Sequence, residues 1–421
     1  MSDIVEQITK AFEEDNAAHV RELFEAHPEL KALINEPIAA FDAPAITCVR
    51  SPQMLDVLLA AGADINAKSR WWAGGFGLLH TAEPELAAHA ISRGAIVDAP
   101  AAARLNLLGT LHELISADPQ LVHVRGGDGQ TPLHFASTVE GAEYLLDHGA
   151  DIDARDVDHE STPAQYMVRD RQTVARHLVQ SGCRTDILMA AALGDANLVV
   201  KHLDADPECI RVRVNEEFFP KSNPRSGGTI YQWTLGFHVS PHDVAKEFKH
   251  EGVLKLLMER SPADVKLLAA CWLADETTVN SLLAEHPEVA ASLRDADRRQ
   301  IADAARNNNL AALRLMLAAG LPVDAIGQHG ATPLHWAAFH GNAEMIRLIL
   351  PHQPPLNQSD AEFHGTPLGW AIHGSENGWY RETGNYSATA ELLLDAGAKP
   401  PEKIAGTDEV REALRRYGVK D

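Results

Sequence analysis

The chain has 421 residues, of which 45% are hydrophobic and 23% are charged, and its formal net charge is −22. This length exceeds what one hydrophobic core usually supports, so the chain either divides into domains or forms a solenoid, whose core grows in one dimension. The acidic balance argues against a nucleic-acid-binding protein, because affinity for phosphate rests on Lys and Arg.

Nothing in the sequence points to a membrane or to an oxidising compartment. The four cysteines lie far apart and form no C-x-x-C pair, which fits the reducing cytoplasm. The N-terminal segment is acidic and amphipathic, without the basic start and apolar core of a signal peptide. No window approaches the apolar length of a membrane span. We therefore expect a cytoplasmic protein whose partners include no membrane and no nucleic acid.

Taken in chain order, the predicted elements are pairs of short amphipathic helices joined by turns. Residues 1–36 form a polar first pair. From Gly127 a sharper pattern appears, in which a Thr-Pro dipeptide opens an apolar helix and a second helix ends at glycine; it returns at Gln328 and Phe363. The threonine hydroxyl can cap the first helix, and proline suits the first helical position. Residues 407–421 end the chain with a polar helix.

A period of about 33 residues, built as a turn and two helices, is the signature of ankyrin repeats. The chain resembles the ankyrin-repeat family, in a divergent bacterial type. The resemblance implies an all-α solenoid of about twelve helix-turn-helix units with finger loops. It would be a single continuous domain over residues 1–421, with 1–36 and 407–421 as polar caps. It also implies a protein partner, bound in the concave groove and by the fingers; the acidic charge favours a basic one.

The 21 histidines invite a metal hypothesis that their spacing does not support. His335 and His340 are spaced i, i+5, whereas zinc-binding helices use i, i+4 so that both rings share a face. In the ankyrin family the histidine that follows Thr-Pro-Leu, here His134 and His335, forms hydrogen bonds within and between turns. We therefore expect no metal site and no cofactor.

Several polar and aromatic side chains are expected to face the groove. In the family, groove positions are the turn just before Thr-Pro and the exposed end of the first helix. The candidates are His329 and His364 in the turns, Phe339, His340 and His373 at the helix ends, and Trp336 and Trp370 beside them. Because these residues come from adjacent repeats, their side chains should converge. Such a cluster of aromatic and imidazole groups favours a shared ligand surface.

A first insertion, residues 216–239, interrupts the repeat. Strand-forming residues at 210–214 and 229–237 flank a run of turn formers, so the simplest prediction is a long β-hairpin that enlarges one finger. Such a hairpin could close one side of the groove as a flap. The ligand-contacting candidates here are Tyr231, Trp233, Phe237 and His238, together with Trp72 in the glycine-rich finger loop that begins at Trp71.

A second insertion, residues 374–387, separates two helices that a normal repeat joins by a tight turn. Its aromatic content argues against disorder. Trp379, Tyr380 and Arg381 are further candidates for ligand contact, and Glu382 is a candidate acid or base.

The helix after the first insertion keeps the repeat pattern, with Ser240 as its cap and Pro241 at its first position. His242 replaces the inward leucine of the family pattern. It either packs under the insertion, hydrogen-bonded to a backbone carbonyl, or faces a polar pocket; we favour the first interpretation.

Two functions from different classes follow. The first is a protein-binding module. The alternative is a small-molecule-binding protein or acid–base enzyme, whose pocket is closed by the two aromatic insertions and takes a sugar-like or aromatic ligand. The catalytic candidates are His238, His242, Asp243, Glu247 and Glu382, with His340 and His373 in addition. No nucleophile elbow, phosphate loop, zinc-protease helix or Rossmann glycines are present, so the sequence leaves enzyme status open.

Overall fold

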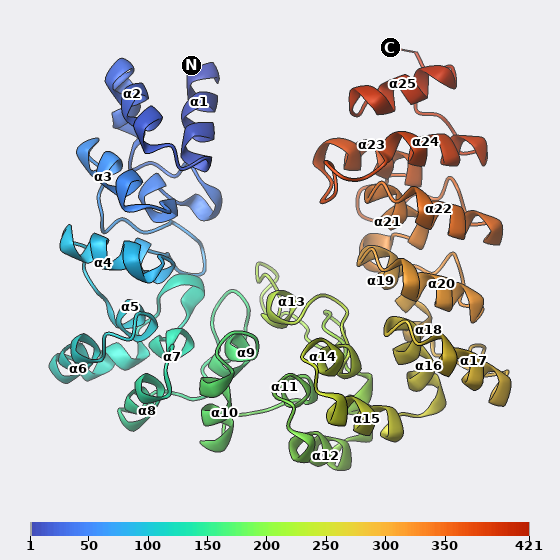
Figure 1. Ribbon diagram of the computed structural model, residues 1–421, viewed down its shortest axis with the longest axis horizontal. Coiled ribbons are helices and arrows are strands. Elements are labelled where there is room, and N and C mark those ends of the chain that lie inside the picture. The colour runs from blue at the N-terminus through green and yellow to red at the C-terminus, as the bar shows by residue number, and fades with distance from the viewer. Residues whose placement is uncertain (1, 421) are drawn as a thin grey trace. The chain divides into compact units, whose positions relative to one another are not determined.

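The computed structural model describes residues 2–420 as short α-helices and 3-10 helices joined by turns (Figure 1). Over these residues it contains no β-strand, only isolated bridges between Ala39 and Ala43 and between Lys68 and Gly77. The all-α prediction is therefore confirmed for the described part of the chain. No helix in that part is long and apolar enough to cross a membrane.

The chain divides into two compact units, each with a hydrophobic core. The first unit contains Met1–Leu193 and Val214–Phe237, and the second contains Gly194–Arg213 and His238–Asp421. The single continuous solenoid over 1–421, with its terminal caps, stays a prediction.

The first unit is built mainly from pairs of helices that follow one another along the chain. Its α-helices are α1 (Ser2–Glu13), α2 (Ala17–Ala26), α3 (Pro52–Ala60), α4 (Pro84–Ser92), α5 (Ala99–Arg104), α6 (Leu108–Ala117), α7 (Pro132–Phe135), α8 (Val139–Asp147), α9 (Pro163–Met167), α10 (Gln172–Gln180), α11 (Ile187–Leu193) and α13 (Tyr231–Thr234). Its 3-10 helices are η1 (Pro28–Leu33), η2 (Ala40–Asp42), η3 (Ala45–Cys48), η4 (Leu78–His80), η5 (Pro119–His123) and η6 (Gly127–Gly129).

The second unit repeats the same helix-pair plan. Its α-helices are α12 (Ala196–Ala205), α14 (Pro241–Glu247), α15 (Glu251–Arg260), α16 (Ala263–Trp272), α17 (Glu276–Glu285), α18 (Asp295–Arg298), α19 (Gln300–Arg306), α20 (Leu310–Ala318), α21 (Pro333–Phe339), α22 (Ala343–Ile349), α23 (Pro367–Asn377), α24 (Tyr386–Asp395) and α25 (Asp408–Arg416). Its 3-10 helices are η7 (Pro207–Arg211), η8 (Gln328–Gly330) and η9 (Leu350–His352).

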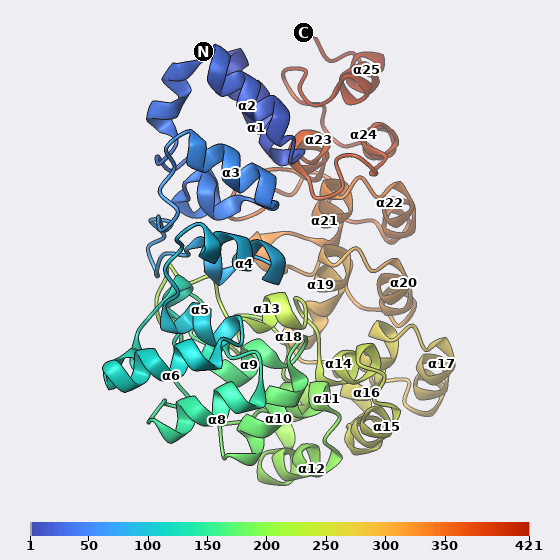
Figure 2. The same cartoon turned by 60° about the vertical axis from the view of Figure 1, so that its left-hand side comes forward.

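Within the second unit, the pairs α19–α20, α21–α22 and α23–α24 stack in chain order in both views (Figures 1 and 2). First helices contact first helices and second helices contact second helices, as α21 does with α23 and α22 with α24. Leu334, Ala337 and Ile346 are fully buried between them. Burying each large apolar side chain contributes about 2 kcal/mol, and each pair can bury its apolar faces only by stacking on its neighbours.

The motif histidines stabilise these stacks through hydrogen bonds. The N–H of Thr332 donates to Nδ1 of His335 at 3.2 Å, and Nε2 of His335 donates to the carbonyl of Gln358 at 3.0 Å. His134 donates in the same way to the carbonyl of Ser161 at 3.1 Å. Burial lowers the pKa of His134 to about 3, so its ring is neutral, as this donor–acceptor pattern requires. The structural role expected for these histidines is confirmed.

Candidate functional site

The predicted β-hairpin at 216–239 is wrong. The segment is a run of turns that contains the short helix α13, and neither expected strand forms. The first strand is replaced by the end of η7, and the second, 229–237, is interrupted by α13 and by Gly236, whose φ is 115°. Strand-forming residues make a strand only where a neighbouring strand satisfies their backbone groups, and here side chains do so instead.

The insertion is held by one finger turn of the first unit, the turn that precedes Thr162. The carboxylate of Glu160 accepts the N–H of Ser222 at 2.9 Å and that of Asn223 at 2.7 Å. The hydroxyl of Ser161 accepts the N–H of Ile230 at 3.0 Å. These bonds replace the strand ladder and fix the insertion to the turn.

Two of the predicted ligand contacts instead fasten the insertion. Tyr231 is fully buried, and its hydroxyl donates to Asp186 at 2.9 Å. Burial, reinforced by the neighbouring Asp186 carboxylate, raises the pKa of Tyr231 well above its usual value, so the hydroxyl stays protonated. The guanidinium carbon of Arg225 lies 4.5 Å from the ring centroid of Trp72, a cation–π contact.

A pocket of about 610 Å³ lies between the insertion and the turns of the first unit. Its apolar lining includes Phe41, Trp71, Phe76, Ile230 and Trp233, and its polar lining includes Asp128, Asp158, His159 and Arg225. Trp233 and Phe41 are 66% and 57% exposed, so their rings also meet solvent. Among the predicted site residues, Trp233 lines the pocket, and the ring of Phe237 lies 6.0 Å from that of Trp233.

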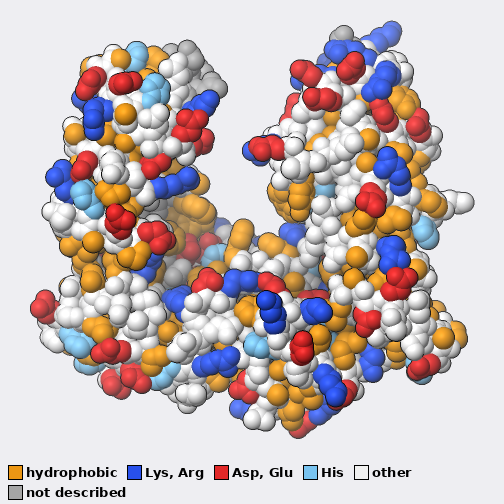
Figure 3. Space-filling model, in the orientation of Figure 1, with side chains coloured by type: hydrophobic (Ala, Val, Ile, Leu, Met, Phe, Trp, Pro, Cys, Tyr) orange, Lys and Arg blue, Asp and Glu red, His pale blue; other side chains and the backbone are white. Residues whose placement is uncertain are grey.

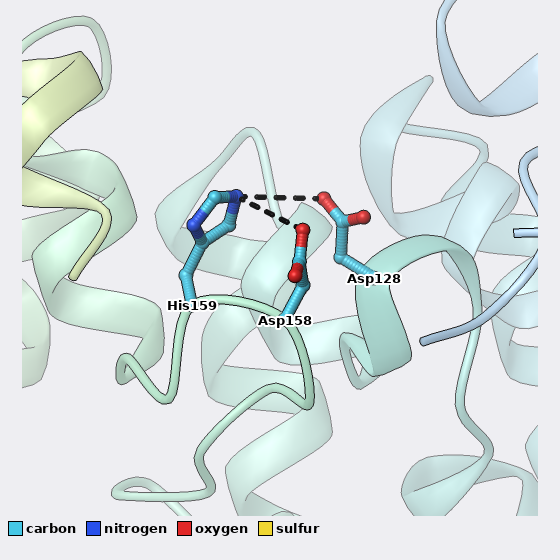
Figure 4. A group of neighbouring side chains, drawn as sticks. All are labelled: Asp128, Asp158 and His159. Carbon is cyan, nitrogen blue, oxygen red and sulfur yellow. Dashed lines mark ion pairs between the residues drawn. The ribbon is translucent and has the colours of Figure 1, made fainter. Parts of the chain in front are cut away.

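Three polar side chains of this pocket converge on one point (Figure 4). Nε2 of His159 lies 3.9 Å from Oδ2 of Asp128 and 3.8 Å from Oδ2 of Asp158. The other ring nitrogen, Nδ1, lies 2.8 Å from the carbonyl oxygen of Gly228. Because a carbonyl only accepts hydrogen bonds, Nδ1 carries a proton, and Nε2 is the ring nitrogen that faces the two carboxylates.

Burial makes this group of charges costly. Burial, together with the nearby Asp158 and Asp156 carboxylates, raises the pKa of Asp128 to about 6, although His159 partly opposes this shift. Only 15% of the side-chain surface of Asp128 and 8% of that of Asp158 is exposed. A carboxyl group that titrates near neutrality in a pocket is typical of functional sites.

These three residues are not among the candidates expected from the repeat pattern, although the sequence contains a signal for them. Asp128 lies three positions before Thr131 and His159 three before Thr162, the same turn position that His329 occupies before Thr332. Asp128 and His329 even share the left-handed backbone, with φ of 54° and 60°. The expectation that turns before Thr-Pro face the groove therefore extends from the histidines of the later repeats to the turns of this earlier one.

The second unit carries a cluster that we call the aromatic face. It comprises His329, Trp336, Phe339, His340, Phe363, Trp370, His373, Trp379 and Tyr380. The ring centroid of Trp336 lies 5.0 Å from that of Trp370 and 6.0 Å from that of Trp379. The guanidinium carbon of Arg306 lies 5.3 Å from the Trp379 ring centroid. The structure thus brings together most of the groove residues expected from the later repeats.

The second insertion supplies part of this face. Helix α23 continues to Asn377, so the expected loop 374–387 is helical at its start, and α24 begins at Tyr386. The hydroxyl of Tyr386 donates to the carbonyl of Phe339 at 3.1 Å, and the N–H of Asn385 donates to that of Gly341 at 2.8 Å. These bonds tie the turn that carries Trp379 and Tyr380 to the end of α21.

The aromatic face has a buried layer and an exposed layer. Trp336 and Trp370 are 3% and 7% exposed, whereas Phe363, Trp379 and Tyr380 are 62%, 59% and 38% exposed. Large rings with this much exposed surface are uncommon outside binding sites.

Two histidines near this face have structural partners. His340 is 1% exposed and its Nε2 donates to the carbonyl of Arg306 at 2.8 Å; burial lowers its pKa to about 4. Nδ1 of His238 lies 3.4 Å from Oδ2 of Asp303. Burial first, and then the charges of Arg306 and Arg213, lower the pKa of His238 to about 3, so this contact joins a neutral imidazole to a carboxylate.

The five catalytic candidates do not gather in one site. His242 is fully buried with Nε2 at 2.9 Å from the Ser261 hydroxyl, and Asp243 caps its own helix through Ser240. Glu247 is exposed at the end of α14. Glu382 is exposed and pairs at 3.9 Å with Arg381.

The remaining predicted residues are on the surface. The exposed His373 ring stacks on Phe339 with centroids 6.4 Å apart. His364 is exposed in its turn with a φ of 57°. His329 forms a close ion-pair contact with Glu362.

Comparison with known families and proteins agrees with the repeated helix pairs. A family described as "Ankyrin repeats (3 copies)" matches residues 301–403, and the family "Ankyrin repeat" matches 128–157. Over 126 residues, which are 30% of this chain, the sequence is 27% identical to palmitoyltransferase Hip14 of Drosophila melanogaster. The matched part covers 18% of the length of that relative. The chain therefore contains ankyrin repeats, with a matched segment in each of its two compact units.

Proposed function

We propose that this protein binds a protein partner through the aromatic face and the finger turns of its second unit. Ankyrin repeats in general imply protein–protein interaction. The observation that carries the proposal is the exposed layer of Phe363, Trp379 and Tyr380, held on a buried layer of tryptophans. Aromatic side chains in such settings dominate the binding energy of protein interfaces.

The exposed rings are held in place before any partner arrives. Trp379 stacks on Trp336, and Phe363 contacts Trp370 with centroids 6.1 Å apart. The indole N–H of Trp370 donates to Asp360 at 2.9 Å, which fixes the supporting ring. Side chains that are already ordered lose little conformational entropy on binding, so more of the contact energy appears as affinity.

The surroundings of this face favour a partner segment with apolar and basic side chains. Glu362, Glu376 and Glu382 have 56%, 44% and 84% of their side-chain surface exposed. Figure 3 shows hydrophobic and acidic side chains close together on this part of the second unit. An apolar side chain of the partner can lie against the exposed Trp379 ring, which already has a cation–π contact with Arg306, while the exposed glutamates attract basic side chains beside it.

Replacing Trp379 with alanine is expected to weaken the affinity for such a partner by about 30-fold, because truncating a central aromatic residue typically costs about 2 kcal/mol of binding free energy. The measurement is a selection from a random peptide library on the intact protein, followed by affinity determination for the enriched peptides. Phe363→Ala should act in the same direction, whereas Tyr417→Ala, an exposed aromatic residue outside the aromatic face, should not. Enriched peptides that lack basic residues, or that bind Trp379→Ala as tightly, would contradict the proposal.

A second candidate function, small-molecule binding, is favoured by the pocket of about 610 Å³ in the first unit. Its volume and mixed lining of aromatic rings and few polar groups suit a drug-sized ligand with an aromatic or sugar-like ring. A ligand at 100 times its dissociation constant should stabilise the fold by about 2.7 kcal/mol. Thermal-shift screening of chelator-treated protein tests this, with Trp233→Ala as the variant that should lose the shift. A hit that shifts Trp233→Ala equally would rule out this pocket.

A further inference from the structure

We propose that Asp128, Asp158 and His159 bind a divalent transition-metal ion at the wall of the first unit's pocket. Each residue offers one ligand atom, and these atoms lie within 4.8 Å of one another. In Figure 4 the same ring nitrogen of His159 faces both carboxylates. This assignment goes beyond partner binding by the second unit and does not depend on it.

The geometry of His159 is that of a metal ligand. Its Nδ1–H donates to the carbonyl of Gly228 at 2.8 Å, which sets the tautomer and the ring orientation. Metal-binding histidines characteristically use their second nitrogen in this way, and the bond leaves Nε2 as the ligand atom.

The separations also fit a shared ion better than hydrogen bonds. Nε2 lies 3.9 Å from Asp128 and 3.8 Å from Asp158, beyond the usual limit of about 3.2 Å for an N–H···O bond. Two ligand atoms that share one ion at about 2.1 Å each can lie up to about 4.2 Å apart. The two separations from Nε2 of His159 fall within that limit.

Backbone hydrogen bonds hold the two turns together. The carbonyl of Asp128 accepts the N–H of Val157 at 2.8 Å and that of Asp158 at 3.1 Å. The N–H of Gly227 donates to Oδ1 of Asp158 at 3.1 Å, which leaves Oδ2 directed at His159. The ligand set therefore comes from two adjacent turns and is oriented by the insertion through Gly227 and Gly228.

The ligand types indicate which ions fit. One imidazole and two carboxylates suit zinc, cobalt, manganese or iron(II), whereas calcium and magnesium prefer oxygen ligands alone. Two largely buried carboxylates need a positive charge to offset their desolvation, and a divalent ion supplies it. Three protein ligands leave coordination positions for water, on the side where all three residues line the pocket.

The second unit contains a matched control. His329 and Glu362 occupy the same turn positions as Asp128 and Asp158. There the imidazole contacts the carboxylate directly, so no gap remains for an ion between them.

The experiment is a titration of chelator-treated full-length protein with Co²⁺, followed by visible absorption and calorimetry. We expect one ion per chain, displaced by Zn²⁺ and not by Mg²⁺ or Ca²⁺. His159→Gln and Asp128→Asn should each weaken binding by about 100-fold or more, and His329→Gln should leave it unchanged. Circular dichroism of the metal-free variants shows whether each one folds. If one of the two ligand variants does not fold, the other still tests the site.

Equal cobalt affinity of the wild type, His159→Gln and His329→Gln would overturn the site, as would displacement by Ca²⁺. An absence of cobalt binding would mean that the three groups form an internal ion pair only. Because the small-molecule screen uses metal-free protein, its failure leaves this result unaffected. A failure of the aromatic face to bind peptides would likewise leave the cobalt-binding result unaffected.

Discussion

Replacing Asp243 with asparagine is expected to lower the free energy of unfolding by about 3 kcal/mol, although asparagine has the same shape. Arg213 has only 8% of its side-chain surface exposed, and Oδ2 of Asp243 lies 3.7 Å from its NH2. Burial lowers the pKa of Arg213, and the charge of Asp243 is the foremost influence that opposes this. Removing one partner leaves a buried charge poorly compensated. The measurement is urea unfolding followed by circular dichroism.

Asp243 also has a second structural role. Its Oδ2 accepts the N–H of Ser240 at 2.8 Å and the hydroxyl of Ser240 at 2.7 Å, which closes the capping box of α14. The control is Glu259→Gln, which breaks an exposed pair with Lys255 at 3.8 Å and should cost less than about 0.5 kcal/mol. In a double-mutant cycle, Arg213→Met combined with Asp243→Asn should cost less than the sum of the two. Additive costs would show that the pair does not interact.

The parts of the fold that could be predicted from the sequence depend on local interactions. The Thr-Pro cap and the motif histidine of a repeat lie within one helical turn, so Thr332 and His335 find each other in any copy. The aromatic face could also be predicted, because Trp336 and Trp370 hold the same position in successive repeats. Stacked first helices then place their rings 5.0 Å apart.

The insertion at 216–239 could not be predicted because its partners are distant in sequence. Glu160 and Ser161 bind Ser222, Asn223 and Ile230 across more than sixty positions. A pattern of apolar and polar residues reports local periodicity, and it contains no information about which acceptors will satisfy the backbone. Strand-forming residues without a neighbouring strand therefore formed turns and a short helix.

The candidate metal ligands were missed for a different reason. Helical spacing of i, i+4 detects ligands on one helix, but Asp128 and His159 come from turns about one repeat apart. In a repeat protein the equivalent positions of neighbouring units are neighbours in space, so spacings near the repeat length are informative. A search for acidic and imidazole side chains at the turn position of successive repeats would have found them.

Replacing His242 with leucine is expected to change the free energy of unfolding by less than about 1 kcal/mol near pH 7.5. At pH 5 the difference between the variant and the wild type should shift by about 2 kcal/mol in favour of the variant. His242 is fully buried, and its Nε2–H donates to the Ser261 hydroxyl, which itself donates to the carbonyl of Leu257 at 2.8 Å. Leucine gives up this one hydrogen bond and gains apolar burial, and the two effects nearly cancel.

The pH dependence follows from the imidazole. Burial lowers the pKa of His242 to about 4, and the charge of Asp243 raises it in part. The unfolded chain binds the proton near pH 6.5, so the wild type keeps its full stability above that value and loses it as the pH falls toward 4. Leucine cannot take up the proton, so the gap between the two unfolding curves should widen on acidification.

Urea unfolding at both pH values tests this, with the exposed His352→Leu as the control, because a solvated histidine gives no such gap. Protonation of other buried histidines, such as His134 and His340, lowers the free energy of unfolding of the wild type and of His242→Leu by the same amount. Only the difference between the two proteins therefore reports on His242. A gap that stays constant with pH would show that folding does not shift the pKa of His242. A gap that changes in the opposite sense, with the leucine variant losing stability relative to the wild type on acidification, would show that the folded state stabilises the imidazolium with Asp243 as its counter-ion.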